Sequence, residues 1–433
     1  MKKIFQYIML AVVTIVMASC TSDIEETTAT TGKNNVQLVV GEFLAFGDSQ
    51  TRAIGTPDEG KTSWAVGDEL LLEMTSKTLG TKYAAFKYNG SSWELASGEL
   101  SYKEDEVPTF PHVYYAPNYK WEAGKLVLKE GKVAGTDEYI EGKAEITGNG
   151  QGINVSFAEA TRNYSRLRIA TMPNKPITVA FNNRYTPAGS SVNANFPRYT
   201  LTSDEKGNAY LYGTFGQYCD FEVKYEGAPL ASHTFNQAAE SAKSYALDAT
   251  VVSLADEGIT YDQIVEDVKK ELDAGKTYIN LILAPDADEE TLDAINIGLQ
   301  KAGYGSINLT LIGCKKIPSG GFRHFGMLKS IALPDVTEIG ENAFSGCTKL
   351  EKVVLGNLTK VYGNVGENGI FDGLKTKYID LVLSEEQKVM KSEFYENSNQ
   401  YIWKPTGESY FASPDYDNGI FLGYQFNSVK SWE

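Results

Sequence analysis

A 22-residue period in the second half of the chain restricts the possible folds more than any other feature of the sequence. Under a shift of 22 residues, Leu309, Leu311, Cys314, Ile317 and Phe322 fall on Ile331, Leu333, Val336, Ile339 and Phe344, and a second shift brings Val353, Leu355, Leu358 and Val361 onto the first four places. A unit this short cannot bury its own apolar face, so neighbouring units must stack around one core. The sequence therefore predicts a short solenoid of four or five stacked strands.

The phrase "LPDVTEIGENAFSGCTKLEKVVL" (333–355) resembles the BspA-type leucine-rich repeat, and the match covers roughly residues 279–384. An insertion near "GNVGENG" moves the next ladder phenylalanine to Phe371. Cys347 stands where that repeat often carries a cysteine, which implies a structural role. Residues 385–433 are rich in aromatic side chains, and we expect them to cap the array, because solenoid ends need a cover.

Two helices are predicted at the start of this region. "TYDQIVEDVKKELDAG" has Thr260 and Gln263 at capping-box spacing and Gly275 as a stop. "DEETLDAINIGLQKAG" has acidic residues in its first turn and Gly303 past its end. A short apolar strand follows each helix, at 279–283 and 307–313. The region 254–433 is therefore expected to be a small α/β solenoid with an aromatic cap.

The first half of the chain alternates apolar and polar residues between turn residues, which is typical of half-buried strands. "TRAIGTPDEGKTSWAVGDELLLEM" (51–74) resembles the opening of fimbrillin-like (Mfa/FimA-type) proteins of Bacteroidota, and "VSFAEATRNYSRLRI" (155–169) is similar to the start of their second domain. The resemblance implies a mainly β fold with two transthyretin-like β-sandwich domains, at 36–152 and 153–253, ahead of the solenoid. We expect Trp64 to cover the first core, and Gly67 and Asp68 to form the turn that directs Leu70, Leu72 and Met74 to one face.

The N-terminal residues have the pattern of an export signal: Lys2 and Lys3, an apolar run, and small residues before Cys20. "VMASC" resembles a bacterial lipobox, which implies that residues 1–19 are removed and that Cys20 is lipidated. An ordinary secretory signal with an incidental cysteine is the alternative. Residues 20–35 are polar and predict a flexible tether. The "SDIEE" within them resembles the surface-export signal of Bacteroidota lipoproteins, which implies an outer-membrane protein facing the cell exterior.

Arg52 has a possible processing role. In fimbrillins a trypsin-like protease cuts after an arginine in this segment, so the resemblance implies cleavage between Arg52 and Ala53 and an open strand edge for a neighbour's donor strand. An uncut loop arginine is the alternative. Fimbrillins that polymerise use their own C-terminal segment as the donor, whereas this chain ends in a solenoid.

Several chemistries are disfavoured. A formal net charge of −16, from 56 acidic and 40 basic residues, argues against nucleic acid as a partner. "LAFGDSQT" (44–51) resembles the nucleophile block of GDSL-type hydrolases, but the histidines His112, His233 and His324 lack the Asp-x-x-His spacing of that family's base, so Ser49 is interpreted as a loop residue and no enzyme activity is expected. Cys219, Cys314 and Cys347 are too scattered for a disulfide framework or a metal site.

Two further segments have alternative interpretations. "PDADEETLD" (285–293) has enough carboxylates for calcium but lacks the spacing of a calcium loop, so helix capping is favoured. "HVYYAPNYKW" (112–121) could stack sugar rings, but core packing is favoured. No metal and no cofactor is predicted.

Together these patterns predict a surface-anchored fimbrial or adhesin lipoprotein, in which a sandwich stalk presents a leucine-rich-repeat head. Its partner would be a protein, an extracellular-matrix or host-surface ligand, or other fimbrial subunits. We expect binding through charged residues between the ladder positions: Lys329, Glu338, Glu341, Lys349, Glu351 and Lys352. The alternative function is a glycan-capture lipoprotein for nutrient uptake.

Overall fold

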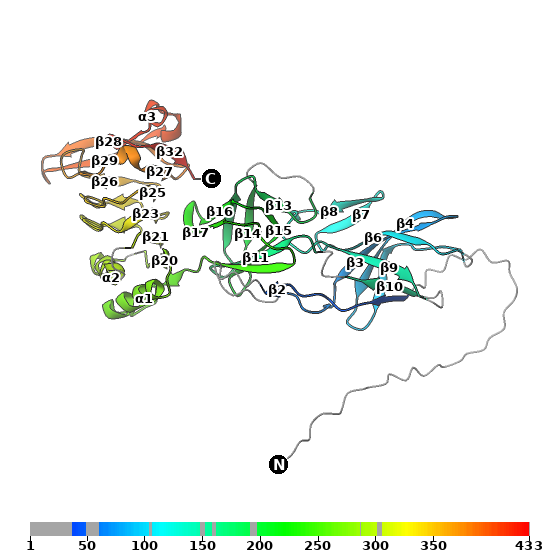
Figure 1. The fold of residues 1–433 in the computed structure, drawn as a ribbon. Coiled ribbons are helices and arrows are strands. Elements are labelled where there is room, and N and C mark those ends of the chain that lie inside the picture. Colours follow the sequence, from blue (N-terminus) through cyan, green and yellow to red (C-terminus); the bar gives the residue numbers. More distant parts are fainter. Residues whose placement is uncertain are drawn as a thin grey trace, which may run out of the picture.

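The computed structural model describes residues 37–48, 60–103, 106–147, 152–157, 162–190, 197–285, 287–300 and 305–432. The fold is mainly β, as predicted, with several sheets. Figure 1 shows three bodies in succession: a first β-body at one end, a second β-body in the middle, and a stack of short strands at the other end. Within the described residues, no helix is long and apolar enough to cross a membrane.

The first β-body is one seven-stranded sheet in the order β1-β10-β9-β6-β3-β4-β5. Its strands are β1 (Gln37–Val40), β3 (Glu69–Ser76), β4 (Gly80–Tyr88), β5 (Trp93–Gly98), β6 (Thr109–Tyr115), β9 (Ile140–Ile146) and β10 (Gly152–Ser156). The end strands β1 and β5 contact each other, so the sheet curls around its own core. Leu70, Leu72 and Met74 lie in that core, as predicted. A hairpin of β7 (Tyr119–Glu122) and β8 (Lys125–Leu128) covers part of the other face.

Trp64 lies at the rim of the first core, where its indole ring contacts other aromatic rings edge-on. The ring centroids of Phe43, Trp93 and Tyr115 are 4.9, 5.2 and 5.2 Å from it. The following turn depends on Asp68, whose carboxylate accepts a hydrogen bond of 2.7 Å from the Ala65 amide. This turn leads directly into β3, so the sequence-based prediction for the segment is confirmed.

The second β-body has two sheets with one aromatic core between them. One sheet has the order β13-β15-β11-β18-β2 and the other β14-β12-β16-β17. The strands are β2 (Gly47–Asp48), β11 (Ser165–Ala170), β12 (Pro176–Phe181), β13 (Tyr185–Pro187), β14 (Arg198–Thr202), β15 (Asn208–Phe215), β16 (Cys219–Tyr225), β17 (Ala228–Phe235) and β18 (Lys243–Asp248).

The segment 37–48 contributes a strand to each β-body. β1 pairs with β10 in the first sheet, whereas β2 pairs with β18 in the second body. Between these strands, Phe46 is buried against the guanidinium group of Arg162, whose carbon is 3.8 Å from the ring centroid. Arg162 also forms a buried ion pair of 2.9 Å with Glu138. The two β-bodies are therefore joined through this N-terminal segment and a buried charge pair.

The third body, here called the repeat body (residues 252–432), contains the predicted ladder. Its parallel sheet has the order β19-β20-β21-β23-β25-β27-β32. These strands are β19 (Val252–Ser253), β20 (Tyr278–Ile282), β21 (Ile307–Ile312), β23 (Leu328–Leu333), β25 (Lys352–Leu355), β27 (Asp380–Leu383) and β32 (Ser428–Ser431). A second sheet, β22-β24-β26-β29-β28, contains β22 (Lys316–Ile317), β24 (Glu338–Ile339), β26 (Lys360–Tyr362), β28 (Lys388–Tyr395) and β29 (Gln400–Ser409).

The strand register reproduces the sequence period. Ile331 pairs with both Leu309 and Val353, each 22 residues away. The phenylalanines of successive units stack inside the body: the rings of Phe322 and Phe344 are 6.1 Å apart and almost parallel, and Phe344 and Phe371 are 5.4 Å apart. The insertion lengthens one coil without breaking this stack.

The two predicted helices cover the start of the ladder. In α1 (Tyr261–Asp273), Thr260 and Gln263 form the predicted capping box, and Ile264, Val265 and Val268 are buried. In α2 (Glu289–Gln300), the Asp288 carboxylate accepts a 2.9 Å hydrogen bond from the Thr291 amide. The acidic cluster therefore caps a helix, as favoured from the sequence.

The C-terminal residues close the other end of the stack. The hairpin β28–β29 extends the second sheet by pairing with β26, and β32 extends the ladder sheet by pairing with β27. Five ladder strands fall in the predicted repeat region, and β19 and β32 add one strand at each end. The shorter elements here are η3 (Thr376–Tyr378), η4 (Tyr410–Ala412), α3 (Pro414–Asp417), β30 (Ile420–Phe421) and β31 (Tyr424–Gln425). Tyr410, Phe421, Tyr424 and Phe426 extend the core of the repeat body, so these aromatic residues cover its end.

Candidate functional site

The residues predicted to be modified lie outside the described residues. This holds for Cys20 and for Arg52 and Ala53, and Ser49, which was interpreted as a loop residue, also lies outside them. The described segment ends at β2, immediately before this stretch, and resumes at Gly60. The lipidation and cleavage hypotheses therefore stay predictions from the sequence.

The three remaining cysteines are buried free thiols, as predicted. Burial raises the pKa of Cys219 and Cys347 to about 12 and that of Cys314 to about 11. A thiol that stays protonated at neutral pH is a poor nucleophile and a poor metal ligand. Across the described ranges, no group of three or more His, Cys, Asp or Glu side chains is arranged to hold a metal ion.

The segment 112–121 packs mainly inward. Tyr114, Tyr115 and Tyr119 are all less than one-tenth exposed. Trp121 lies partly buried against the Tyr83 ring, at a centroid distance of 4.7 Å. Core packing therefore accounts for these aromatic residues.

One face of the ladder sheet is docked against the second β-body, a contact that the sequence analysis did not predict. Asn280 donates a hydrogen bond of 2.9 Å to the Leu230 carbonyl, and Thr310 donates one of 2.9 Å to the Pro229 carbonyl. Further along the sheet, Ala228 is fully buried in a small apolar cluster with ladder residues. The face of β20, β21, β23 and β25 is therefore an internal joint of the molecule.

The same joint includes charged and aromatic contacts. Lys352, one of the residues expected to bind a partner, forms an ion pair of 2.9 Å with Glu222 of the second β-body. At Gly227, which has a φ of +76°, an added Cβ would lie 2.6 Å from the Trp432 ring. In the sequence, the small and neutral residues at the outward positions of the ladder strands could have indicated that this face is covered. For Lys352, the expectation of a free binding role is wrong.

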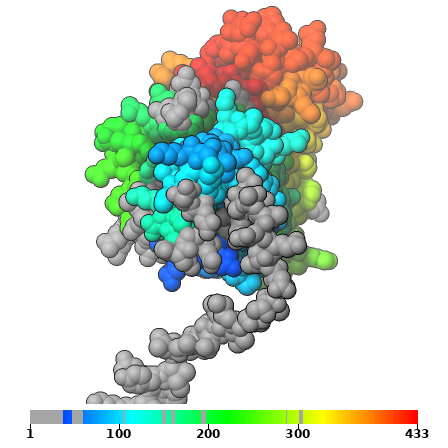
Figure 2. Space-filling view, turned by 90° about the vertical axis from the view of Figure 1, so that its right-hand side faces the viewer, coloured from blue at the N-terminus to red at the C-terminus, as the bar shows by residue number. Residues whose placement is uncertain are grey.

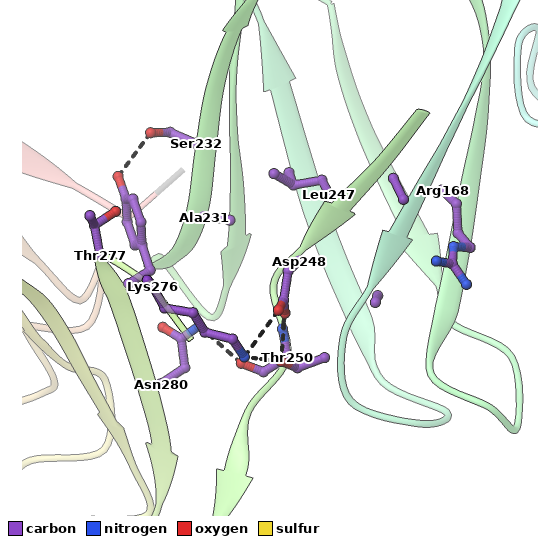
Figure 3. A pocket seen from close by; sticks show the side chains of 13 residues that line it. Arg168, Ala231, Ser232, Leu247, Asp248, Thr250, Lys276, Thr277 and Asn280 are labelled. Atoms are coloured by element: carbon purple, nitrogen blue, oxygen red, sulfur yellow. Dashed lines mark hydrogen bonds and ion pairs between the residues drawn. The ribbon is translucent and has the colours of Figure 1, made fainter. Parts of the chain in front are cut away.

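A polar cleft opens beside this joint, with a volume of about 470 Å³ (Figure 3). Strands β11, β17 and β18 line one side, and residues 275–280 of the repeat body line the other. Lys276 crosses between the two bodies: its ammonium group lies 2.9 Å from Thr250 Oγ1, 3.0 Å from Asp248 and 2.6 Å from Glu271. Nearby, the Tyr278 and Ser232 hydroxyls are 2.9 Å apart.

The protonation states in this cleft follow from these contacts. Burial alone would lower the pKa of Lys276, but its hydrogen bonds to Glu271 and Asp248 outweigh burial and raise the pKa. Burial raises the pKa of Asp248, but hydrogen bonds from Thr250 and Lys276 outweigh this effect and lower it. Both groups are therefore charged at neutral pH, and they hold the two bodies together as an ion pair.

Neither a scan against models of protein families nor a search of the curated proteins finds a match for this chain.

Proposed function

We propose that this chain is a lipid-anchored protein of the bacterial cell surface, an adhesin or fimbrial subunit without enzymatic activity. In this proposal the two β-bodies are fimbrillin-like, transthyretin-like domains that form a stalk. The repeat body is a leucine-rich-repeat head, and it binds a matrix or host-surface ligand or another fimbrial subunit.

The observation that carries the proposal is the linear order of the three bodies. The first β-body, which contains β1, lies at one end of the molecule, and the repeat body lies at the other (Figure 1). An anchor at Cys20 would therefore hold the first β-body nearest the membrane and direct the head outward. The lipobox-like "VMASC" and the fimbrillin-like segments of the sequence support the same orientation.

The N-terminal segment supports a fimbrial role as well. β1 and β2 are edge strands, and β2 has only two residues. After cleavage at Arg52, the N-terminal piece that carries Cys20 would be joined to the rest of the chain only through these two edge strands and Phe46, so the uncut chain is the firmly lipid-anchored form. A donor strand from another subunit could then replace the cleaved piece at either edge, because an unpaired strand edge readily accepts another chain.

Replacing Cys20 tests the anchor and the adhesion together. In the producing bacterium, Cys20→Ala should move the protein from the membrane fraction to the medium, because several acyl chains anchor a protein far more firmly than one. Ser22→Ala, which leaves the cysteine in place, is the matched control and should stay in the membrane. Adhesion of the cells to a matrix-coated surface should fall with Cys20→Ala only. A Cys20→Ala protein that remains membrane-bound would contradict the proposal.

One observation favours a second candidate, glycan capture for nutrient uptake. The cleft between the bodies is lined by hydroxyl and amide groups as well as by the charged side chains of Arg168, Asp248 and Lys276. The side-chain oxygen of buried Asn280 has no hydrogen-bond partner in the described part of the chain. Such a lining suits a small polar ligand such as an oligosaccharide. Calorimetric titration with neutral oligosaccharides separates the two candidates, since an adhesin head predicts no heat from this cleft.

A further inference from the structure

The second sheet of the repeat body carries a row of lysines that becomes evident only from the strand register. Lys391 of β28 lies directly opposite Lys404 of β29. On the other side of β29, Val361 of β26 pairs with Trp403. Because the two strands are antiparallel, Lys360 of β26 lies opposite Lys404. Directly opposite residues share a face of a sheet. Lys360, Lys404 and Lys391, here called the lysine row, therefore stand side by side on three adjacent strands.

The lysine row has no carboxylate partner. On the other side of Lys360, Glu338 of β24 lies directly opposite it, but the Glu338 carboxylate forms its ion pair with Lys316, at 3.2 Å. In contrast, no ion pair within 4.0 Å involves any of the three lysines among the residues that the structure describes. Adjacent strands are about 4.8 Å apart, and like charges directly opposite each other destabilise a sheet. A local conflict of this kind is expected at a binding surface, where a ligand of opposite charge relieves it.

Two tyrosines and one glutamate lie beside the row on the same face, where the Tyr395 hydroxyl donates a 2.9 Å hydrogen bond to the Glu393 carboxylate. The Lys404 ammonium group donates a 2.6 Å hydrogen bond to the Tyr395 hydroxyl and lies 4.6 Å from the centre of its ring. The Lys360 ammonium group lies 4.4 Å from the centre of the Tyr362 ring. Its hydrogen bond to Tyr362 raises the pKa of Lys360, so this lysine stays charged. Phenol groups next to ammonium groups offer both hydrogen bonding and a flat ring to a ligand.

The face that carries the row is free within this chain. The ladder sheet is the one that docks on the second β-body, and β26, β28 and β29 lie on the opposite side of the stack (Figure 1). Lys391 and Lys404 are exposed. In the end-on view of Figure 2, the C-terminal part of the repeat body projects beyond the first β-body. A large ligand can therefore reach this part of the head.

We propose that the lysine row binds an anionic polysaccharide, a chain of sugars that carry sulfate or carboxylate groups. Three ammonium groups in line match a polymer with repeated negative charges. The chain as a whole has a net charge of −16, so its other surfaces repel such a polymer and leave this row as the favoured contact. The inference rests on the proposed function, because it names the class of matrix ligand that the head would hold.

An acidic protein fits this face less well. Protein interfaces usually have an apolar anchor at their centre. The exposed Phe394 is three residues from Lys391 and therefore points to the opposite side of the hairpin, because successive side chains of a strand alternate between its faces. The face with the lysine row thus offers charge and hydroxyl groups, which is what a hydrated polysaccharide can use.

The test uses the purified full chain and surfaces coated with heparin, polygalacturonate, dextran or poly-glutamate. Heparin or polygalacturonate should bind, and uncharged dextran should not. The variant K360Q/K391Q/K404Q should raise the Kd for the anionic polysaccharide at least tenfold, which corresponds to about 1.4 kcal/mol. It should also make the dependence of log K on log salt shallower by about 2, because three charge contacts are lost.

Two control variants make the result specific. K103Q/K125Q/K206Q removes the same charge from exposed lysines of the two β-bodies and should leave the Kd within twofold. K360R/K391R/K404R keeps the charge and should bind like the natural chain. The thermal midpoint of the glutamine variant should not fall, since the substitution removes repulsion.

Three results would overturn the inference: equal weakening by both glutamine variants, no weakening by either, or tighter binding to poly-glutamate than to both anionic polysaccharides. The last result would identify an acidic protein as the ligand. These results leave the proposed function intact as long as Cys20→Ala still releases the protein and abolishes adhesion.

Discussion

Replacing Phe344 by alanine should unfold the repeat body selectively. Phe344 is fully buried between the stacked rings of Phe322 and Phe371, at centroid distances of 6.1 and 5.4 Å. Both neighbours belong to other coils, so the coils cannot easily close around the missing ring. Truncating a buried phenylalanine typically costs about 3–5 kcal/mol. For a body of this size, that cost corresponds to a fall in Tm of about 6–20 °C.

Differential scanning calorimetry of the full chain measures this effect. The transition of the repeat body should move down, while that of the first β-body, which shares no core with it, should stay in place. Phe394→Ala is the matched control, because Phe394 is 48% exposed and its loss should cost about 1 kcal/mol or less. If the two variants lower the Tm equally, the stacked phenylalanines do not hold the coils together and the ladder interpretation of stability fails.

Two further predictions concern the joint and the N-terminal segment. The pKa of Asp248 is lower in the folded protein than the ordinary aspartate value of about 3.9. Its ion pair with Lys276 therefore stabilises the fold above that pH, and this stabilisation is lost as the pH falls through the lower folded pKa. The natural chain should therefore unfold at a higher temperature than Lys276→Met at pH 7, with the gap closing towards pH 3; a gap independent of pH would refute this. Limited trypsin treatment of the folded protein should cut first after Arg52 and leave Ala53 as the new N-terminus, whereas Arg52→Gln should resist; any other first fragment on N-terminal sequencing would count against donor-strand exchange.

Local patterns in the sequence predicted local structure well. The capping box at Thr260 and Gln263 depends on residues three positions apart, and it forms as expected. The 22-residue shift predicted the partners of Ile331 correctly, because stacking a repeat requires equivalent residues to pair. The alternation of Leu70, Leu72 and Met74 likewise identified the core face of β3. In each case the physical cause lies within one strand, one helix turn or one repeat.

Contacts between distant segments could not be predicted in this way. β2 pairs with β18 although nearly two hundred residues separate them, and two residues are too few to show a periodic pattern. The lysine row was hidden for a similar reason. Lys391 and Lys404 lie in an aromatic-rich tail without a repeat, and only the fold of the β28–β29 hairpin brings them together beside Lys360.

The docking of the ladder sheet determines where a ligand can bind to the repeat body. An isolated solenoid would expose both of its sheets, and the charged residues between ladder positions would compete for a partner. Here the second β-body already occupies three side chains of the ladder sheet. Asn280 and Thr310 donate hydrogen bonds to its backbone carbonyls, and Lys352 forms an ion pair with Glu222. An external ligand could bind these groups only if their contacts with the second β-body were broken first. The sheet that contains the lysine row has no such contact with the β-bodies in the described residues, so a ligand can occupy it while the repeat body stays docked on the second β-body.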